Sequence, residues 1–214
     1  ELLFRAKDED VAIFMDGDAA TSEVIQSTFV DIGLQRLVGN KTAFINLTKT
    51  FLNNGTAQAF PPDRVVLELL EDIEIDADVI EGVRELSRNG YRIALDDYVY
   101  DPVHAPLLQL ASVVKIDLKQ VNGTELERHV RELRRYDVKL LAEKVETQEE
   151  YQTCLNLGFD YFQGFFLSRP SVVHGNRIPA NRLAVVQLMS RFYRANVDIR
   201  ELEAHISKDV SLSY

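Results

Sequence analysis

Cysteine and histidine are scarce in this sequence of 214 residues, which holds one cysteine and four histidines. Cys154 lies in a helical pattern with no cysteine or histidine close to it in the sequence. We therefore expect it to be a small packed core residue and not a nucleophile or metal ligand. The histidines are scattered without ligand spacing, so we assign them surface or packing roles. A site built on thiols or imidazoles is not expected.

Positive charge and long apolar runs are lacking as well. Lysine and arginine number 24 against 34 acidic residues, a formal net charge of −10, so nonspecific binding to a nucleic-acid polymer is not expected. No apolar run approaches the roughly 20 residues of a membrane span, and no signal peptide opens the chain. We therefore expect no membrane segment and a cytoplasmic location. Because the first residue is Glu1, we expect a fragment or a trimmed N-terminus.

Short apolar runs alternate with amphipathic helical patterns through most of the chain. This alternation predicts parallel strands joined by crossover helices. Polar residues end nearly every run, which favours a TIM-like (β/α)8 barrel over a doubly wound open sheet. An irregular strand or hairpin is expected over 1–15. The predicted strands lie near 42–47, 64–70, 91–96, 112–117, 138–143 and 159–163, and the predicted helices near 22–39, 76–89, 102–110, 119–135 and 147–157.

The strand ends carry an oxygen-rich set of side chains, which suits Mg²⁺ or Mn²⁺ better than zinc. Two such ions could hold a phosphodiester and activate water, and Lys115 could stabilise an anionic oxygen. Helix caps or surface ion pairs are the simpler role for any single acid, but so many carboxylates together repel one another unless a cation neutralises them. The set comprises Glu1, Asn46, Glu68, Asp96, Asp97, Glu143 and Gln163.

Several motifs in this order resemble the EAL domain, the bacterial phosphodiesterase module that linearises cyclic di-GMP. The resemblance covers residues 1–170. It rests on Glu1-Leu2-Leu3-Phe4-Arg5, Asn46, Glu68-Leu69-Leu70-Glu71, Asp96-Asp97, Lys115 with Asp117, Glu143 with Glu146, and Gln163-Gly164 with Pro170.

The resemblance assigns a role to each matching residue. It implies that Lys115, Glu143, Asp97 and Gln163 serve catalysis, and that Arg5 and Leu3 contact the substrate. Tyr98 could stack on a base, although local packing is the simpler alternative. Glu71, Asp117 and Glu146 would support the loops. The implied metal ligands are Glu1, Asn46, Glu68, Asp96, Asp97 and Glu143.

Two positions depart from the pattern of active members. The double aspartate is normally followed by a glycine-containing loop, whereas here Tyr98-Val99-Tyr100-Asp101-Pro102 contains no glycine. Without glycine the usual loop conformation, and with it the two-metal geometry, is not expected. Lys144 stands where glycine is usual. Its ammonium could neutralise the acids, but we expect it to point into solvent.

The C-terminal part, 171–214, reads as a linker and helices, and it resembles the start of an HDOD module. We therefore expect a degenerate EAL domain of the EAL-HDOD type, with little or no hydrolysis, that senses cyclic di-GMP or acts as an interaction scaffold. The alternative is an active metal-dependent phosphodiesterase that yields linear pGpG. A competent site would hold Mg²⁺ or Mn²⁺, while a degenerate one need hold neither. A homodimer is also expected from the resemblance.

Overall fold

The computed structural model describes residues 2, 33–53 and 55–168. The predicted N-terminal hairpin, most of the predicted helix near 22–39 and the HDOD-like segment therefore lie outside the described residues. The chain divides into two compact units, Glu1–Val66 with Val173–Tyr214 and Leu67–Val172.

In the first unit, the core element is strand β1 (Ala43–Leu47), whose alternate residues are buried. Leu2 forms a parallel bridge to Ile45, and the Leu2 amide donates to the Phe44 carbonyl at 2.9 Å. The described start of the chain is therefore extended, as predicted. The unit also contains helices α2 (Leu34–Val38) and α3 (Lys49–Asn53) and the 3-10 turn η2 (Thr56–Ala59).

The six strands form one sheet in the order β1-β2-β3-β4-β5-β6. Each strand lies beside its neighbour in sequence, and the pairs from β3 to β6 are parallel. A doubly wound sheet would reverse this order at a switch point, whereas a barrel keeps it. The order confirms the TIM-like (β/α) barrel class. The remaining strands are β2 (Val65–Leu69), β3 (Arg92–Leu95), β4 (Val113–Asp117), β5 (Lys139–Glu143) and β6 (Tyr161–Phe162).

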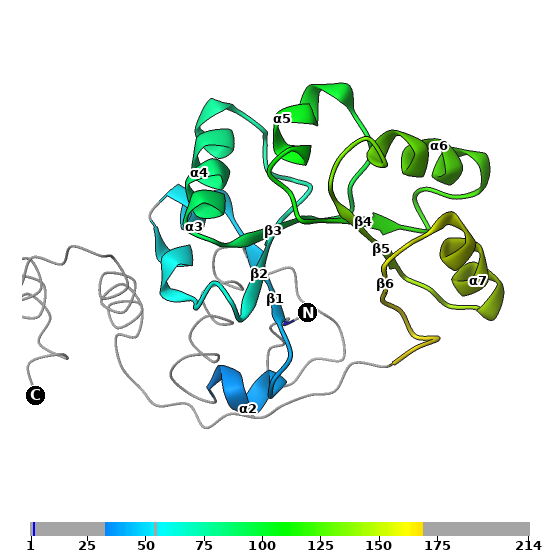
Figure 1. The fold of residues 1–214 in the computed structure, drawn as a ribbon, viewed down its shortest axis with the longest axis horizontal. Helices are drawn as coiled ribbons and strands as arrows, with labels where there is room; N and C mark the ends of the chain where they lie inside the picture. Colours follow the sequence, from blue (N-terminus) through cyan, green and yellow to red (C-terminus); the bar gives the residue numbers. More distant parts are fainter. Residues whose placement is uncertain (1, 3–32, 54, 169–214) are drawn as a thin grey trace, which may run out of the picture. The chain divides into compact units, whose positions relative to one another are not determined.

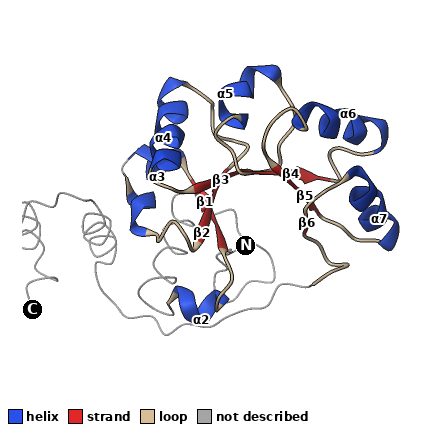
Figure 2. Cartoon of the chain, viewed as in Figure 1, coloured by secondary structure: helices blue, strands red, loops and turns tan. Residues whose placement is uncertain are grey.

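Helices cover one side of the strands in the second unit (Figures 1 and 2). In α4, Val79, Val83 and Leu86 recur on one face at helical spacing and are buried, as the amphipathic pattern predicts. Strands β2 and β4 are buried at every position, so the polar residues on them are held inside protein. The helices are α4 (Ala77–Arg88), α5 (Ala105–Leu108), α6 (Gly123–Leu133) and α7 (Gln148–Leu157), with the 3-10 turn η3 at Pro102–His104. None of the described helices has the length and apolar character needed to cross a bilayer.

Element bounds follow the predictions with two main differences. The predicted helix near 119–135 begins only at Gly123, because the chain first turns with Gln120 and Val121 donating to the Asp117 carbonyl. The predicted helix near 102–110 is divided into η3 and the short α5. Both differences lie in the segments that follow β3 and β4, and the short elements α3 and η2 between β1 and β2 were not predicted.

The capping box of α7 offers a local stability test. The Thr147 hydroxyl accepts from the Glu150 amide at 3.1 Å, and the Glu150 carboxylate accepts from the Thr147 amide at 3.1 Å. Thr147→Ala should lower the free energy of unfolding by about 1 kcal/mol, because it leaves a helix amide without its acceptor. Urea unfolding measures the change. Thr147→Ser keeps the hydroxyl and should stay near wild type, and equal losses in both variants would contradict the capping role.

Candidate active site

The C-terminal ends of β2 to β5 bring acidic residues and one lysine together in the second unit. Glu68 lies on β2, Asp96 and Asp97 follow β3, Lys115 lies on β4, and Glu143 ends β5. The register pairs Asp117 with Glu143 across β4 and β5. Parallel strands place these ends at one edge of the sheet, so residues far apart in sequence become neighbours.

Lys115 is the centre of this group. Its Nζ lies 2.7 Å from Glu68 Oε1, 2.6 Å from Asp96 Oδ1 and 3.0 Å from Glu143 Oε1. The lysine side chain is 1% exposed and that of Glu68 is 0% exposed. Taking such charges out of water is costly unless they are paired, and a single ammonium here serves three carboxylates. The predicted grouping of Glu68, Asp96 and Glu143 around Lys115 is therefore present.

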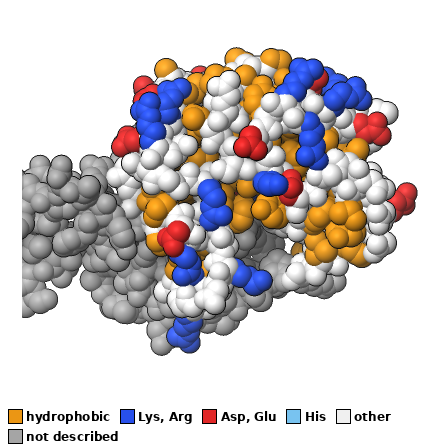
Figure 3. Space-filling model, viewed as in Figure 1, with side chains coloured by type: hydrophobic (Ala, Val, Ile, Leu, Met, Phe, Trp, Pro, Cys, Tyr) orange, Lys and Arg blue, Asp and Glu red, His pale blue; other side chains and the backbone are white. Residues whose placement is uncertain are grey.

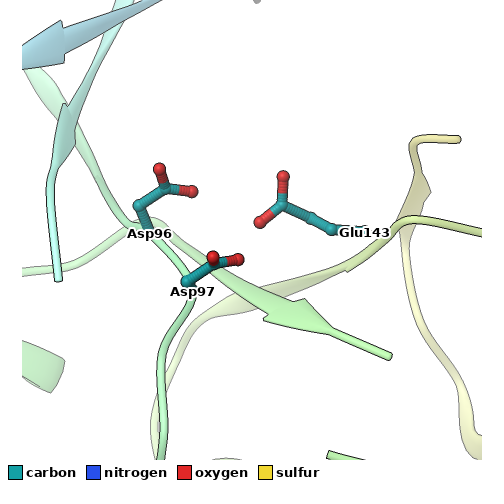
Figure 4. Close-up of side chains that lie close together, drawn as sticks. All are labelled: Asp96, Asp97 and Glu143. Atoms are coloured by element: carbon teal, nitrogen blue, oxygen red, sulfur yellow. The ribbon is translucent and has the colours of Figure 1, made fainter. Parts of the chain in front are cut away.

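Asp96, Asp97 and Glu143 each offer a carboxylate oxygen, and these oxygens lie within 4.8 Å of one another. Figure 4 shows the three carboxylates directed towards a common space. Glu143 Oε2 is buried and has no hydrogen-bond partner among the described residues. Burial, reinforced by Asp96 and Asp97 and opposed by Lys115, raises the pKa of Glu143 to about 8. An excess of buried acid with an unused oxygen fits a hard divalent cation.

A second network joins Asp97 to Asp117. Gln120 Nε2 donates to Asp97 Oδ2 at 3.2 Å and to Asp117 Oδ2 at 3.3 Å. Lys144 Nζ lies 2.5 Å from Asp117 Oδ2 and 3.7 Å from Asp97 Oδ2. The expectation that Lys144 points into solvent was wrong, because its ammonium is attracted to these two acids. Gln120 was missed altogether, and its place three residues after Asp117 in a turn was the only available signal.

In this second network, Asp117 and Lys144 each stabilise the charged form of the other. Burial alone would raise the pKa of Asp117, but the hydrogen bonds from Lys144 and from the Lys119 amide lower it below its ordinary value. The hydrogen bond to Asp117 in turn raises the pKa of Lys144. Asp117 therefore carries negative charge and Lys144 positive charge at neutral pH. The loop-supporting role of Asp117 stays a prediction.

The loop after β3 contains a buried tyrosine. Tyr98 is 8% exposed, its amide donates to the Lys115 carbonyl at 2.9 Å, and its ring centroid lies 6.0 Å from that of His104. Its hydroxyl reaches the Asp101 carbonyl at 3.5 Å, and burial raises its pKa to about 12. These contacts support the local-packing alternative. Stacking of Tyr98 on a base stays a prediction.

Left-handed backbone occurs at two non-glycine residues of the site. Asp97 has φ 39° and Lys144 has φ 56°. Both conformations are unfavourable for residues with a Cβ and need support from the surrounding structure. Gly164 gives part of that support, because a Cβ there would collide with the backbone of Val145. Only glycine lets the segment after β6 lie against the loop that carries Lys144.

The other predicted residues are spread over the chain. Gln163 directly follows β6, and its backbone bonds to Ala142 and Val145. Glu71 is exposed in the turn after β2, and Glu146 is exposed and pairs with Lys119 at 2.9 Å. Asn46 lies on β1 in the first unit, where its Oδ1 is buried with no hydrogen-bond partner among the described residues. Three predicted residues lie outside the described part: Glu1, Leu3 and Arg5.

A TIM-like barrel whose strand ends gather carboxylates around a lysine defines the class: a (β/α) barrel domain with an acidic site. The sequence profile of the EAL domain matches residues 26–170. The chain belongs to the EAL domain family.

Two curated relatives match along the whole chain. YuxH of Bacillus subtilis is 34% identical, with 100% of this chain and 54% of that protein covered. A Vibrio cholerae protein named cyclic di-GMP phosphodiesterase CdgJ is 32% identical, with 100% and 50% covered. The chain thus spans about half the length of these relatives.

Solved structures show the same fold. The YkuI protein of Bacillus subtilis, solved with cyclic di-GMP and calcium, has a TM-score of 0.60 at 18% identity, covering 96% of this chain and 55% of that one. The EAL domain of Mycobacterium smegmatis DcpA has a TM-score of 0.55 at 26% identity, covering 71% and 81%.

The raised pKa of Glu143 leads to a pH-dependent prediction for the metal-free protein. Between the ordinary value of 4.5 and about 8, the unfolded chain has released a proton that the folded protein keeps. The contribution of Glu143 to the free energy of unfolding should therefore fall as pH rises through this window. Glu143→Gln removes the titration, so it should be more stable than wild type at pH 8, by roughly 1–4 kcal/mol, and similar near pH 4.

Denaturant unfolding from pH 4 to pH 8 in the presence of a chelator measures this effect. Glu146→Gln is the matched control, since that carboxylate is exposed. A Glu143→Gln variant that keeps the wild-type dependence of stability on pH would show that Glu143 is ionised in the folded metal-free state.

Proposed function

We propose that this chain is a regulatory EAL domain that binds cyclic di-GMP with a divalent cation and hydrolyses it slowly or not at all. The observation that supports this most is the ion pairing of Lys144 with Asp97 and Asp117 at the mouth of the acidic site. It places a protein cation beside the second acid of the Asp96-Asp97 pair. The loop after that pair is also packed through Tyr98 and not through glycines.

Asp96, Asp97 and Glu143, together with Glu68, are the described residues that would hold Mg²⁺ or Mn²⁺. When bound, such an ion supplies charge stabilisation at a phosphodiester oxygen and lowers the pKa of a water molecule. Lys115 keeps the buried acids in place through its three ion pairs. Asn46 and Glu1 stay predicted ligands, and Arg5 and Leu3 predicted substrate contacts.

An active phosphodiesterase is the second candidate. It is supported by the retention of Glu68, Asp96, Asp97, Lys115 and Glu143 in one cluster. The relative CdgJ, which matches the whole chain, carries the name of a cyclic di-GMP phosphodiesterase. The two candidates share the ligand and the metal and differ in turnover.

The wider setting of the domain is also part of this proposal. An HDOD module that begins within 171–214, a homodimer and a cytoplasmic location stay predictions. Exposed apolar side chains lie between charged groups on the face shown in Figure 3. Among the described residues, the exposed large apolar side chains are those of Val99, Val103, Leu155, Tyr161, Phe165, Phe166 and Leu167, which offer apolar area for a partner.

Calorimetry and a turnover assay with Mn²⁺ test the proposal together. We expect cyclic di-GMP to bind with a measurable heat and to be recovered intact, with linear pGpG formed at less than one equivalent over hours. Glu68→Gln should weaken Mn²⁺-dependent binding by about tenfold or more, because it removes a buried charge from the site.

Glu127→Gln is the control, since its carboxylate is exposed on α6 and is not part of this cluster. Sustained pGpG release that is lost in Glu68→Gln would establish the enzyme instead. No binding heat at high ligand concentration would remove the nucleotide-sensing role.

A further inference from the structure

Lys144 stands next to Glu143 at the end of β5, yet its ammonium serves a different pair of acids. Nζ lies 2.5 Å from Asp117 Oδ2 and 3.7 Å from Asp97 Oδ2, whereas Glu143 pairs with Lys115. The side chain is 51% exposed, so the ammonium lies at the mouth of the site and not beneath it. The two lysines therefore divide the acids between them.

Gln120 fixes the geometry of this second pair. Its amide nitrogen donates to the same two oxygens, Asp97 Oδ2 and Asp117 Oδ2, that lie near the Lys144 ammonium. Asp117 is 3% exposed, and its other oxygen accepts from the Lys119 amide at 2.8 Å. With Asp117 held in this way, the ammonium is held on the Asp97 side of the cluster.

The backbone conformation of Lys144 supports a functional role for the position of its charge. A φ of 56° is unfavourable for a residue with a Cβ, and glycine would adopt it without that cost. The ion pairs to Asp117 and Asp97 are interactions that lysine gains at this position and glycine could not make. The residue that adopts this unfavourable backbone conformation is thus the residue whose ammonium group lies in the site.

The formal charges of the site show which charge the Lys144 ammonium replaces. Among the described residues, five carboxylates (Glu68, Asp96, Asp97, Asp117 and Glu143) face two ammonium groups, which leaves an excess of three negative charges once all five are ionised to bind a cation. One divalent ion among Asp96, Asp97 and Glu143 nearly balances that excess. A second would overcompensate it and would lie beside the Lys144 ammonium, which repels it.

We propose that Lys144 is a tethered cation that takes the charge position of a second divalent ion, so that the site binds one ion and not two. This inference rests on the proposed metal-binding function. Two-ion sites clamp both the attacking and the leaving oxygen of a phosphodiester, and a fixed ammonium cannot coordinate water in that way. Lys144 is therefore a positioning and specificity residue that favours binding of the nucleotide over its hydrolysis.

Counting bound Mn²⁺ tests the inference without reference to activity. Equilibrium dialysis of the chain, with free Mn²⁺ read by electron paramagnetic resonance, should give one ion per wild-type chain. Lys144→Gln and Lys144→Gly remove the charge and should admit a second ion, with its affinity raised about tenfold or more. Lys144→Arg keeps the charge and should still bind one.

Lys139→Gln is the matched control. That lysine lies at the other end of β5 and pairs with Asp160 at 2.9 Å, so its loss should leave the count at one. A circular dichroism melt of each variant confirms that it is folded before the ions are counted, and Lys144→Gly has the backbone best suited to the observed φ.

The outcomes separate the two proposals. Two ions bound to wild type, or one ion bound to wild type and to both neutral variants, would overturn the role of Lys144 and leave the metal site standing. No ion bound to any folded variant would overturn the metal site and this inference with it. A second ion that also appears in Lys144→Arg would show that side-chain shape, and not charge, controls the count.

Discussion

One buried ammonium is the constraint on which the rest of the site depends. Lys115 pairs with Glu68, Asp96 and Glu143 from three other strand ends, at distances of 2.6 to 3.0 Å. Removing any of these charges from water is costly, so the acids can be buried together only because the lysine is already there. It still leaves more acid than base, and the raised pKa of Glu143 expresses that imbalance. The site therefore keeps an excess of negative charge that a bound cation would neutralise.

The loops that depart from the family pattern neutralise part of this negative charge with protein side chains. After β3, Tyr98 packs against His104 in the loop that lacks the glycines of the family pattern. After β5, Lys144 brings a positive charge to Asp97 and Asp117. Both changes lie on loops, while the acids themselves lie on or beside strands. Loops tolerate such changes because the buried strands β2 and β4 hold Glu68 and Lys115 in place independently of the loops.

Much of the fold and of the acidic site could be predicted because both rest on local patterns. The apolar runs that became β1 to β5 are short and largely buried, and each has a polar residue at or next to its end, so period and spacing were sufficient. The direction of Lys144 was not predictable in this way. It depends on Asp117, 27 residues earlier in the chain, and on a φ of 56° that no propensity favours for lysine. Gln120 was missed for the same reason, since its partner Asp97 lies 23 residues away.

The sequence by itself determined the barrel class, the family and the identity of the acids, because periodicity and ordered motifs are properties of the chain alone. Only the tertiary structure decided how the charges are shared, with Lys115 on Glu68, Asp96 and Glu143 and Lys144 on Asp97 and Asp117. Ion pairing is decided by distance and burial, and parallel strands create those distances only when they are assembled side by side.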